Sequence, residues 1–235
     1  MEGKTNASLV VKYRPRRLAD VLGQLHVTEA MKNFTRAPYP TAFLFAGETG
    51  VGKTSAAIAL AHELGVQVED DELGGLYDLA SGEQTGDSVR KIKAQLRLRP
   101  LFGSGWRVLV VNECDRMSHG AEATWLDVLE RIPEHVVIVF TTNVDNKLSR
   151  RFMDRCEFFH FTSETERLRP YLADLAKRVW KEEGLAGEPP YLDKLGLPCL
   201  DGPDALHASF RLLLQQMQRL LIGESKREDL SHDAA

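Results

Sequence analysis

The sequence of 235 residues lacks several features that would place it in a specialised class. Its three cysteines lie far apart and form no Cys-x-x-Cys pair, which argues against a zinc site or a disulfide framework. No apolar run approaches the roughly 18 residues that a membrane span needs, and the first residues lack the apolar core of a signal peptide. We therefore expect a cytoplasmic protein, or a nuclear one in a eukaryote, that is not secreted and has no membrane partner.

An excess of positive charge is also missing, since the formal net charge is −4. Such a chain has no overall attraction for nucleic acid, so any contact with it must come from a local basic patch. The composition, 43% hydrophobic and 27% charged, is otherwise ordinary for a globular protein, and no internal repeat is visible. A chain of this length suits one large domain, or a core domain with a small appendage.

The most informative motif is an unbroken G-x-x-x-x-G-K-T pattern, which is typical of a phosphate-binding loop, or P-loop. An apolar run at 42–46 precedes it and predicts a buried strand, and an Ala-rich run at 55–64 predicts the helix that follows. Lys53 can reach the β- and γ-phosphates of a nucleotide, and the Thr54 hydroxyl can bind Mg²⁺. A plain Gly-rich turn into a helix would not need Lys and Thr at this spacing. The expected phosphate-binding residues are Gly47, Glu48, Thr49, Gly50, Val51, Gly52, Lys53, Thr54 and Ser55.

Strand-like and helical segments alternate along the next part of the chain. Residues 106–111 and 135–140 are apolar on both faces, as buried parallel strands are. Residues 120–132 between them predict a helix that Pro133 ends, and a shorter strand candidate lies at 76–80. This alternation predicts an α/β fold with a doubly wound, mainly parallel sheet, whose ligands bind at the carboxyl ends of the strands.

From about residue 163 the pattern changes to helices alone. Ser163 and Glu166 have the spacing of a capping box for a helix that runs to Glu183. A last helix carries apolar residues at helical spacing and is expected to end at Gly223. The expected organisation is a P-loop domain over residues 1–162, a small all-helical lid over residues 163–223 and a disordered tail over residues 224–235.

Polar residues follow the two central predicted strands. Asn112 and Glu113 stand where P-loop ATPases usually carry an Asp, which binds a water on Mg²⁺, and a Glu, which orients the attacking water. Glu113 suits that second role, whereas Asn112 brings no negative charge and should weaken Mg²⁺ binding. Asn143, after the next strand, could hold the water near the γ-phosphate, although a turn-forming Asn is common at such a place. The plain alternative for all three is that they only end their strands.

A local basic patch is predicted on the helix at 87–98. Residues 87–99 hold five basic residues against a single acidic one, and Arg90, Lys93 and Arg97 fall on one helical face. Such a stripe suits contacts with the phosphates of a duplex without reading its bases. A charged face that only meets water is the alternative. The candidate DNA-binding residues are Arg90, Lys91, Lys93 and Arg97.

Taken in order, these motifs resemble the AAA+ ATPases of clamp loaders, above all the small subunits of replication factor C and their phage counterparts. The resemblance covers roughly residues 9–222. It rests on residues 12–15, residues 20–24 with their Gly-Gln pair, the P-loop, residues 112–115, residues 142–143 and residues 155–156. The four-cysteine zinc insert of bacterial clamp-loader ATPases is absent from the sequence.

The resemblance implies roles that the spacing of the residues does not give. It matches Asn143 to the sensor 1 residue, Arg155 to the arginine finger offered to a neighbour's ATP, Arg211 to the sensor 2 arginine of the lid, and Tyr13 with Val10 or Val11 to the segment against the adenine. Asp154 replaces the Ser of the family's finger motif. Arg211 also shares a polar face with Gln215 and Gln218, which a solvated helix would show as well.

The function expected from the resemblance is ATP-driven opening and loading of a sliding clamp onto primed DNA. The cofactors would be ATP and Mg²⁺. The partners would be the clamp, other clamp-loader subunits in a ring, and primer–template DNA bound without sequence specificity. Because Asn112 replaces the usual Asp, we expect slow hydrolysis in isolation, and an interaction module that binds nucleotide but hydrolyses it weakly or not at all is one alternative. Another DNA-remodelling AAA+ ATPase, such as a helicase loader or a branch-migration motor, is the second.

Overall fold

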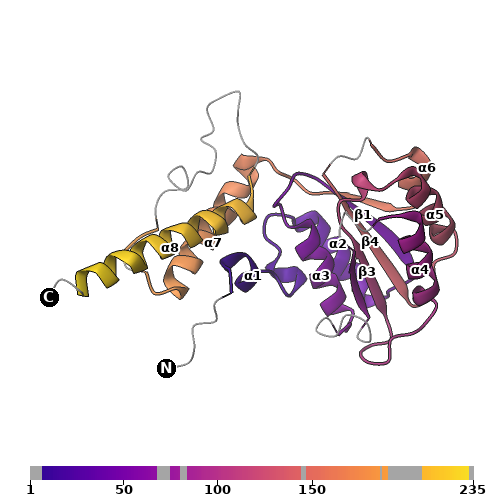
Figure 1. Cartoon of the computed structure of the whole chain (residues 1–235), viewed down its shortest axis with the longest axis horizontal. Coiled ribbons are helices and arrows are strands. Elements are labelled where there is room, and N and C mark those ends of the chain that lie inside the picture. The colour runs from indigo at the N-terminus through magenta and orange to yellow at the C-terminus, as the bar shows by residue number, and fades with distance from the viewer. Residues whose placement is uncertain are drawn as a thin grey trace. The chain divides into compact units, whose positions relative to one another are not determined.

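A computed structural model describes residues 7–67, 75–79, 84–143, 147–185, 187–189 and 208–232. By its contacts the chain divides into two units, one of residues 15–162 and the other of residues 1–14 together with residues 163–235 (Figure 1). The division falls at residue 163, where the predicted lid begins. It differs from the predicted domains at the start of the chain, because residues 1–14 group with the helical unit.

The larger unit is built on a five-stranded parallel sheet with the strand order β2-β3-β4-β1-β5. The strands are β1 (Thr41–Ala46), β2 (Leu76–Leu79), β3 (Arg107–Val111), β4 (Val136–Thr142) and β5 (Glu157–His160). In the central strands, Val137 of β4 pairs with Thr41 of β1 on one side and with Val108 of β3 on the other. The predicted doubly wound parallel sheet is confirmed, and β5 is a strand that the sequence reading did not predict.

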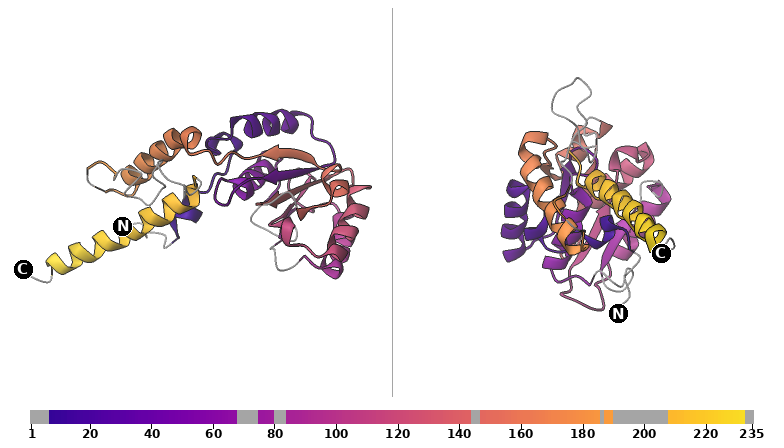
Figure 2. Two further views of the ribbon diagram at one scale, coloured as in Figure 1. Left: turned by 90° about the horizontal axis from the view of Figure 1, so that it is seen from above. Right: turned by 90° about the vertical axis from the view of Figure 1, so that its left-hand side faces the viewer.

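Helices cover both faces of this sheet (Figure 2). The helical elements of the unit are η1 (Leu18–Asp20), α2 (Leu25–Arg36), α3 (Lys53–Glu63), α4 (Gly86–Leu96), η3 (Cys114–Arg116), α5 (His119–Leu129) and α6 (Arg150–Met153). Phe43 and Phe45 of β1 pack in one core cluster with α2 and α3, whereas Ala42 and Leu44 pack in a second cluster with α4, α5 and α6. This alternation follows from the period of two in a strand. It also explains why β1, β3 and β4 are apolar on both faces.

The smaller unit consists of α1 (Leu9–Lys12), α7 (Thr165–Glu182) and α8 (Phe210–His232), with α1 and α7 packed against α8. The backbone N–H of Leu9 donates to Gln218 Oε1 of α8 at 2.8 Å. The predicted capping box is wrong: the N-cap residue of α7 is Glu164 rather than Ser163, and the Glu164 side chain makes no capping hydrogen bond.

The predicted end of the last helix is also wrong. α8 continues through Gly223 to His232, so residues 224–232 are helical and only residues 233–235 of the predicted tail lie outside the described chain. A glycine inside a helix costs only about 1 kcal/mol relative to alanine. The residues that follow it include Glu, Lys and Arg, which form helices readily, so the helix passes through.

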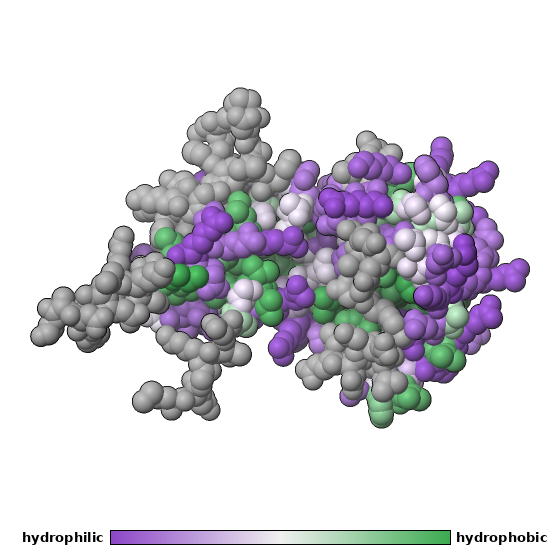
Figure 3. All heavy atoms as spheres, viewed as in Figure 1, coloured by the Kyte–Doolittle hydropathy of each residue, from purple (hydrophilic) through white to green (hydrophobic). Residues whose placement is uncertain are grey.

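Within the described part of the chain, no helix is both long and apolar enough to cross a membrane. The face of the larger unit seen in Figure 3 is mostly hydrophilic, with apolar residues gathered at a few places. Three large apolar side chains that follow α4 are among the most exposed, namely Leu98 (65%), Leu101 (71%) and Phe102 (53%).

Candidate nucleotide-binding site

The predicted P-loop connects the end of β1 to the start of α3. Its glycines Gly47, Gly50 and Gly52 have φ angles of 145°, 80° and 105°, which L side chains rarely adopt. Gly47 is needed for a second reason, since a Cβ atom there would come within 2.5 Å of the Phe161 carbonyl oxygen. Helix α3 begins at Lys53 with Gly52 as its N-cap residue, so no capping side chain competes for its first N–H groups. Those N–H groups can therefore meet an anion.

Lys53 is buried, with 7% of its surface exposed, which is rare for a lysine. Its Nζ donates to the Gly47 carbonyl at 2.6 Å, the Glu48 carbonyl at 2.7 Å and Asn143 Oδ1 at 2.9 Å. An ammonium group has three N–H donors, so this geometry directs each of them at an oxygen. The same donors suit the oxygens of a phosphate.

The candidate metal position lies where α3, β3 and β4 meet. The Thr54 hydroxyl donates to Asn112 Oδ1 at 2.7 Å, and the Thr141 hydroxyl donates to the same atom at 3.2 Å. Oxygen donors are what Mg²⁺ prefers, so Thr54 and Asn112 fit this ion. Both are neutral, so the charge that holds the ion would have to come from bound phosphates.

Glu113 has a left-handed backbone, with φ 52° and ψ 49°, and is the one non-glycine residue with positive φ among the described residues. This conformation costs about 1–2 kcal/mol for an L residue. Two contacts hold the turn: the Glu113 N–H donates to Thr141 Oγ1 at 3.3 Å, and the buried Gln84 donates to the Asn112 carbonyl. The Glu113 carboxylate lies 3.3 Å from Arg116 and is partly exposed. Backbone strain that surrounding contacts maintain is common at functional sites.

Asp115 is part of the site and was not predicted. Its Oδ1 accepts from the Thr142 hydroxyl at 2.9 Å and from the Asn143 N–H at 3.4 Å. The carboxylate thereby fixes the end of β4, and with it the Asn143 side chain that contacts Lys53. No local sequence pattern marks Asp115, because it lies four residues after β3 and reaches the end of β4 only through the pairing of the two strands.

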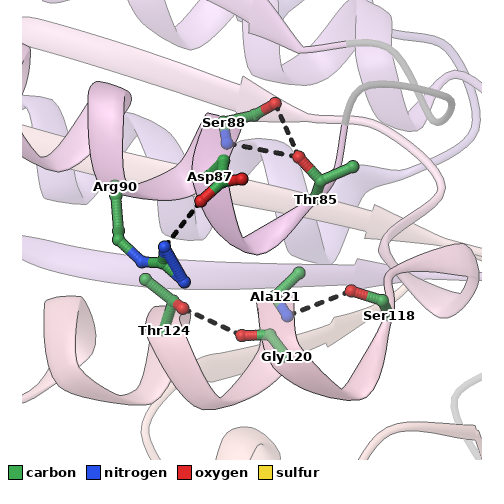
Figure 4. A network of polar contacts seen from close by, with 8 residues as sticks. All are labelled: Thr85, Asp87, Ser88, Arg90, Ser118, Gly120, Ala121 and Thr124. Carbon is green, nitrogen blue, oxygen red and sulfur yellow. Dashed lines mark hydrogen bonds and ion pairs between the residues drawn. The ribbon is translucent and has the colours of Figure 1, made fainter.

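The basic stripe lies on α4, whose N-terminus is beside that of α5 (Figure 4). Thr85 and Ser118 cap the two helices. Arg90 pairs with Asp87 at 2.6 Å in the same helix, with both side chains well exposed, and Lys93 pairs with Asp127 of α5. The hydrogen bond from Lys93 lowers the pKa of the Asp127 carboxyl.

The other two candidate DNA-binding residues are exposed: Lys91 lies on α4, and Arg97 is its C-cap residue. Two of the four predicted DNA-binding residues are therefore already in ion pairs. Such exposed pairs are weak and can be exchanged for phosphates.

Comparisons with known proteins agree on the family. A family model for the DNA polymerase III delta subunit matches residues 76–165. The replication factor C small subunit of Aeropyrum pernix is 31% identical over 183 residues, which is 75% of this chain and 55% of that protein. The small subunit of Methanothermobacter thermautotrophicus is 32% identical over 158 residues, 66% of this chain and 48% of that protein. The chain carries an AAA+ module of the clamp-loader type. It spans about half the length of the curated relatives it matches.

Solved structures of other proteins have a similar fold. The RuvB Holliday junction branch migration motor of Thermotoga maritima matches with a TM-score of 0.55 at 20% identity, over 72% of this chain and 54% of that chain. A DNA polymerase III gamma subunit-related protein of Thermotoga maritima matches with a TM-score of 0.54 at 22% identity, over 66% of this chain and 51% of that chain. At these identities the likeness supports the fold alone.

Arg155, the predicted arginine finger of the AAA+ module, lies in the turn between α6 and β5. Its guanidinium donates to Glu130 Oε1 at 2.7 Å and to the Arg151 carbonyl at 2.9 Å. The side chain is one-third exposed. Arg155 is thus held within its own subunit, and its action on a neighbour stays a prediction.

Val10, Tyr13 and Arg211 belong to the helical unit of the AAA+ module. The Tyr13 hydroxyl donates to Glu183 Oε1 at 2.7 Å, and Lys12 Nζ donates to the same oxygen at 2.8 Å. Burial raises the pKa of Tyr13 and the bond to Glu183 raises it further, so the phenol stays neutral. Arg211 is exposed on α8. The roles of these three residues at a nucleotide stay predictions.

Proposed function

We propose that this chain is the ATP-binding and ATP-hydrolysing part of a clamp-loader subunit, which helps to open a sliding clamp and load it onto primed DNA. The observation that supports this most is the bonding of buried Lys53 to Gly47, Glu48 and Asn143, in a module of the clamp-loader type. A loop with only a structural purpose would have no need of an ammonium group at its centre.

The residues around the loop have distinct tasks in this proposal. The loop N–H groups and Lys53 bind the polyphosphate, and Thr54, with Asn112 through water, holds Mg²⁺. When bound, Mg²⁺ neutralises charge on the β- and γ-phosphates. Asn143 positions the attacking water, and the Glu113 carboxylate orients it and accepts its proton. Phosphoryl transfer depends mainly on positioning and electrostatic stabilisation, which fixed polar groups provide.

Residues outside the loop complete the proposal by resemblance to the family. A neighbouring subunit's finger, the equivalent of Arg155, stabilises the charge on the transferred phosphate. Arg211 contacts the γ-phosphate side of the nucleotide, and Val10 and Tyr13 lie against the adenine. The ring of subunits binds primer–template DNA through phosphate contacts from Arg90, Lys91, Lys93 and Arg97 without sequence specificity.

We further propose that the clamp contacts the segment after α4. Leu98, Leu101 and Phe102 are all more than half exposed within five residues of sequence. Clustered exposed apolar side chains are typical of surfaces that a partner covers. The double substitution of Leu101 and Phe102 to Ser should abolish ATP-dependent association with the clamp from the same source in a pull-down experiment, while nucleotide affinity stays the same. Clamp binding at wild-type strength by the double variant would remove this segment from the proposal.

Asn112 supports the second candidate function, an interaction module that binds nucleotide but hydrolyses it weakly or not at all. Its neutral side chain lies 2.7 Å from the Thr54 hydroxyl, where ATPases usually have a carboxylate. Nucleotide binding with no measurable turnover, even with all subunits of a ring present, would favour this candidate.

Nucleotide binding itself is tested at Lys53. The Lys53→Ala variant should lose binding of ATP by at least about 100-fold, because a buried charge and three hydrogen-bond donors are removed from the phosphate position. Isothermal titration with ATP measures the affinity. Lys177→Ala, which removes an exposed lysine from α7, is the matched control and should bind as the wild type does. Equal affinity of the Lys53→Ala variant and the wild type would overturn the proposed function.

A further inference from the structure

Gln24 has no exposed surface, and its whole side-chain amide is used on one distant residue. Its Nε2 donates to the Thr162 carbonyl at 2.9 Å, and its Oε1 accepts from the Thr162 N–H at 3.0 Å. Both backbone polar groups of Thr162 are therefore bonded to a single side chain. Thr162 is the last residue of the larger unit, and the chain leaves that unit directly after it.

The residue before this exit lies on the P-loop. The Phe161 N–H donates to the Ala46 carbonyl at 2.7 Å, and the Phe161 carbonyl occupies the space that a Cβ atom of Gly47 would enter. Gly47 is also an acceptor for Lys53 Nζ. The P-loop, Phe161 and the exit residue Thr162 thus form one continuous stretch of contacts.

Gln24 is not explained by the needs of its own helix. It is the N-cap residue of α2, yet its side chain makes no capping hydrogen bond there. A buried amide is costly unless it is hydrogen-bonded, and an apolar residue would fill the same space without that cost. The neighbouring buried positions Leu18 and Val27 are apolar. The amide at this position therefore points to a task at Thr162.

We propose that Gln24 is a positioning residue that anchors the exit of the chain at Thr162 and so passes a change at the P-loop to α7. The anchor is a property of the folded larger unit. Its use as a relay rests on the nucleotide binding proposed above. With Thr162 held, a shift of Gly47 and Phe161 moves the exit as one body, whereas with Thr162 released the exit segment absorbs the shift.

The anchor is tested without nucleotide by hydrogen–deuterium exchange of the full chain. In Gln24→Leu, the segment 157–163 should exchange roughly tenfold faster than in the wild type, because the Thr162 N–H loses its buried acceptor. Thr28→Val is the matched control: Thr28 is buried in the same helix and its hydroxyl bonds only locally, to the Leu25 carbonyl at 3.0 Å. The control should leave the segment unchanged. Equal exchange of this segment in Gln24→Leu and the wild type would overturn the anchor.

Gln24→Glu decides the question if Gln24→Leu does not fold. A carboxylate keeps the acceptor for the Thr162 N–H but sets an oxygen against the Thr162 carbonyl, and protonation restores a donor there. The ratio of exchange rates between this variant and the wild type should therefore fall towards one as the pH is lowered. A ratio that does not change with pH would count against the paired amide.

The relay is tested by adding Mg²⁺ and ATPγS to the same proteins. In the wild type, nucleotide should slow exchange both at residues 43–54 and in α7, and in Gln24→Leu only residues 43–54 should respond. An unchanged response of α7 in Gln24→Leu overturns the relay. If residues 43–54 of the wild type do not respond, the proposed function fails and the relay with it, while the measurement without nucleotide still decides the anchor.

Discussion

Asn112 differs from an aspartate by one charge, and here that charge would arise 2.7 Å from the Thr54 hydroxyl. We predict that Asn112→Asp lowers the Mg²⁺ concentration needed for half-maximal ATP turnover by roughly tenfold and raises turnover, because a carboxylate a few ångströms from the ion gains at least about 1 kcal/mol of Coulomb energy. A steady-state ATPase assay over a Mg²⁺ titration measures both quantities.

The matched control is Asn33→Asp, the same change on the exposed side of α2, where Asn33 accepts from Arg36 at 3.0 Å. It should change neither quantity. If Asn112→Asp behaves as this control does, then Asn112 does not serve the metal, and the placement of the ion beside Thr54 is wrong.

Cys114 and Cys156 are the free thiols of the described residues. Burial raises the pKa of Cys114 well above its ordinary value and that of Cys156 to about 12. The thiolate is the reactive form, so in a Cys199→Ser background both thiols should react slowly with Ellman's reagent at pH 8 and at once after denaturation. Because the folded-state pKa values are raised, the unfolded chain ionises first, and stability should fall as the pH rises above about 8.5. Rapid labelling of the native protein at pH 8 would contradict the burial of Cys114 and the partial burial of Cys156.

At the scale of elements, the proposed contact with duplex DNA can be tested on α4. Replacing Arg90, Lys93 and Arg97 by Ala should reduce the log–log salt slope of duplex affinity by about 0.9 for each phosphate that the variant no longer neutralises. Asp127→Asn should instead increase this salt slope, since it releases Lys93 from its ion pair. Fluorescence anisotropy with a labelled duplex over a salt titration, with a non-hydrolysable nucleotide and the subunits that complete a ring, measures the slope.

The control for charge alone removes three exposed basic residues of α7 instead, Arg167, Arg169 and Lys177. It changes the net charge by the same amount and should leave the slope unchanged. Superimposable titrations for the α4 variant and the wild type would reduce the stripe on α4 to a solvated face.

The elements that sequence reasoning found are those whose neighbours impose a strong pattern. β1, β3 and β4 are buried on both faces and are therefore apolar throughout, so their residue types alone predicted them. β5 is largely exposed at the edge of the sheet and reads Glu-Phe-Phe-His, a mixture without a clear period. The end of α8 was predicted wrongly because Gly223 was interpreted as the end of the helix, although a glycine inside a helix costs only about 1 kcal/mol relative to alanine.

Some site residues are likewise marked by a local pattern and others are not. Lys53, Thr54, Asn112 and Asn143 could be predicted because a motif and the ends of adjacent strands fix their places. Asp115 and Gln84 could not, since each bonds to backbone or side-chain groups of a different element. Gln24 was noticed only as half of a Gly-Gln pair. Its hydrogen-bond partner, Thr162, lies 138 residues away, a separation that no local sequence pattern records.

At the scale of the whole molecule, Arg155 should act on the ATP of a neighbour. To do so, the Arg155 guanidinium must leave Glu130 and bind a phosphate of that ATP. Because this ATP is held by another subunit, turnover should rise with protein concentration or with added partner subunits. Arg155→Ala and Lys53→Ala should each be inactive alone. A mixture of the two should regain activity, because the second variant supplies an intact Arg155 to the intact P-loop of the first. A finger acting between subunits is worth roughly 10³–10⁵ in rate.

An ATPase assay of each variant and of the mixture measures this effect. The control is a mixture of Lys53→Ala with the double variant that carries both substitutions, which offers no intact P-loop and should stay inactive. Turnover that is independent of concentration, or a mixture no more active than its parts, would count against Arg155 acting between subunits.

If Glu113 orients the attacking water as proposed, its left-handed backbone sets the stability of the fold against activity at this one residue. Glycine adopts φ near 52° without the cost that an L side chain meets, so Glu113→Gly should raise the free energy of unfolding by about 1 kcal/mol. The same change removes the carboxylate. In a randomised library, variants recovered by heat challenge should collect glycine at residue 113, and variants recovered by turnover should keep glutamate. A lineage that had only to stay folded would have lost this residue.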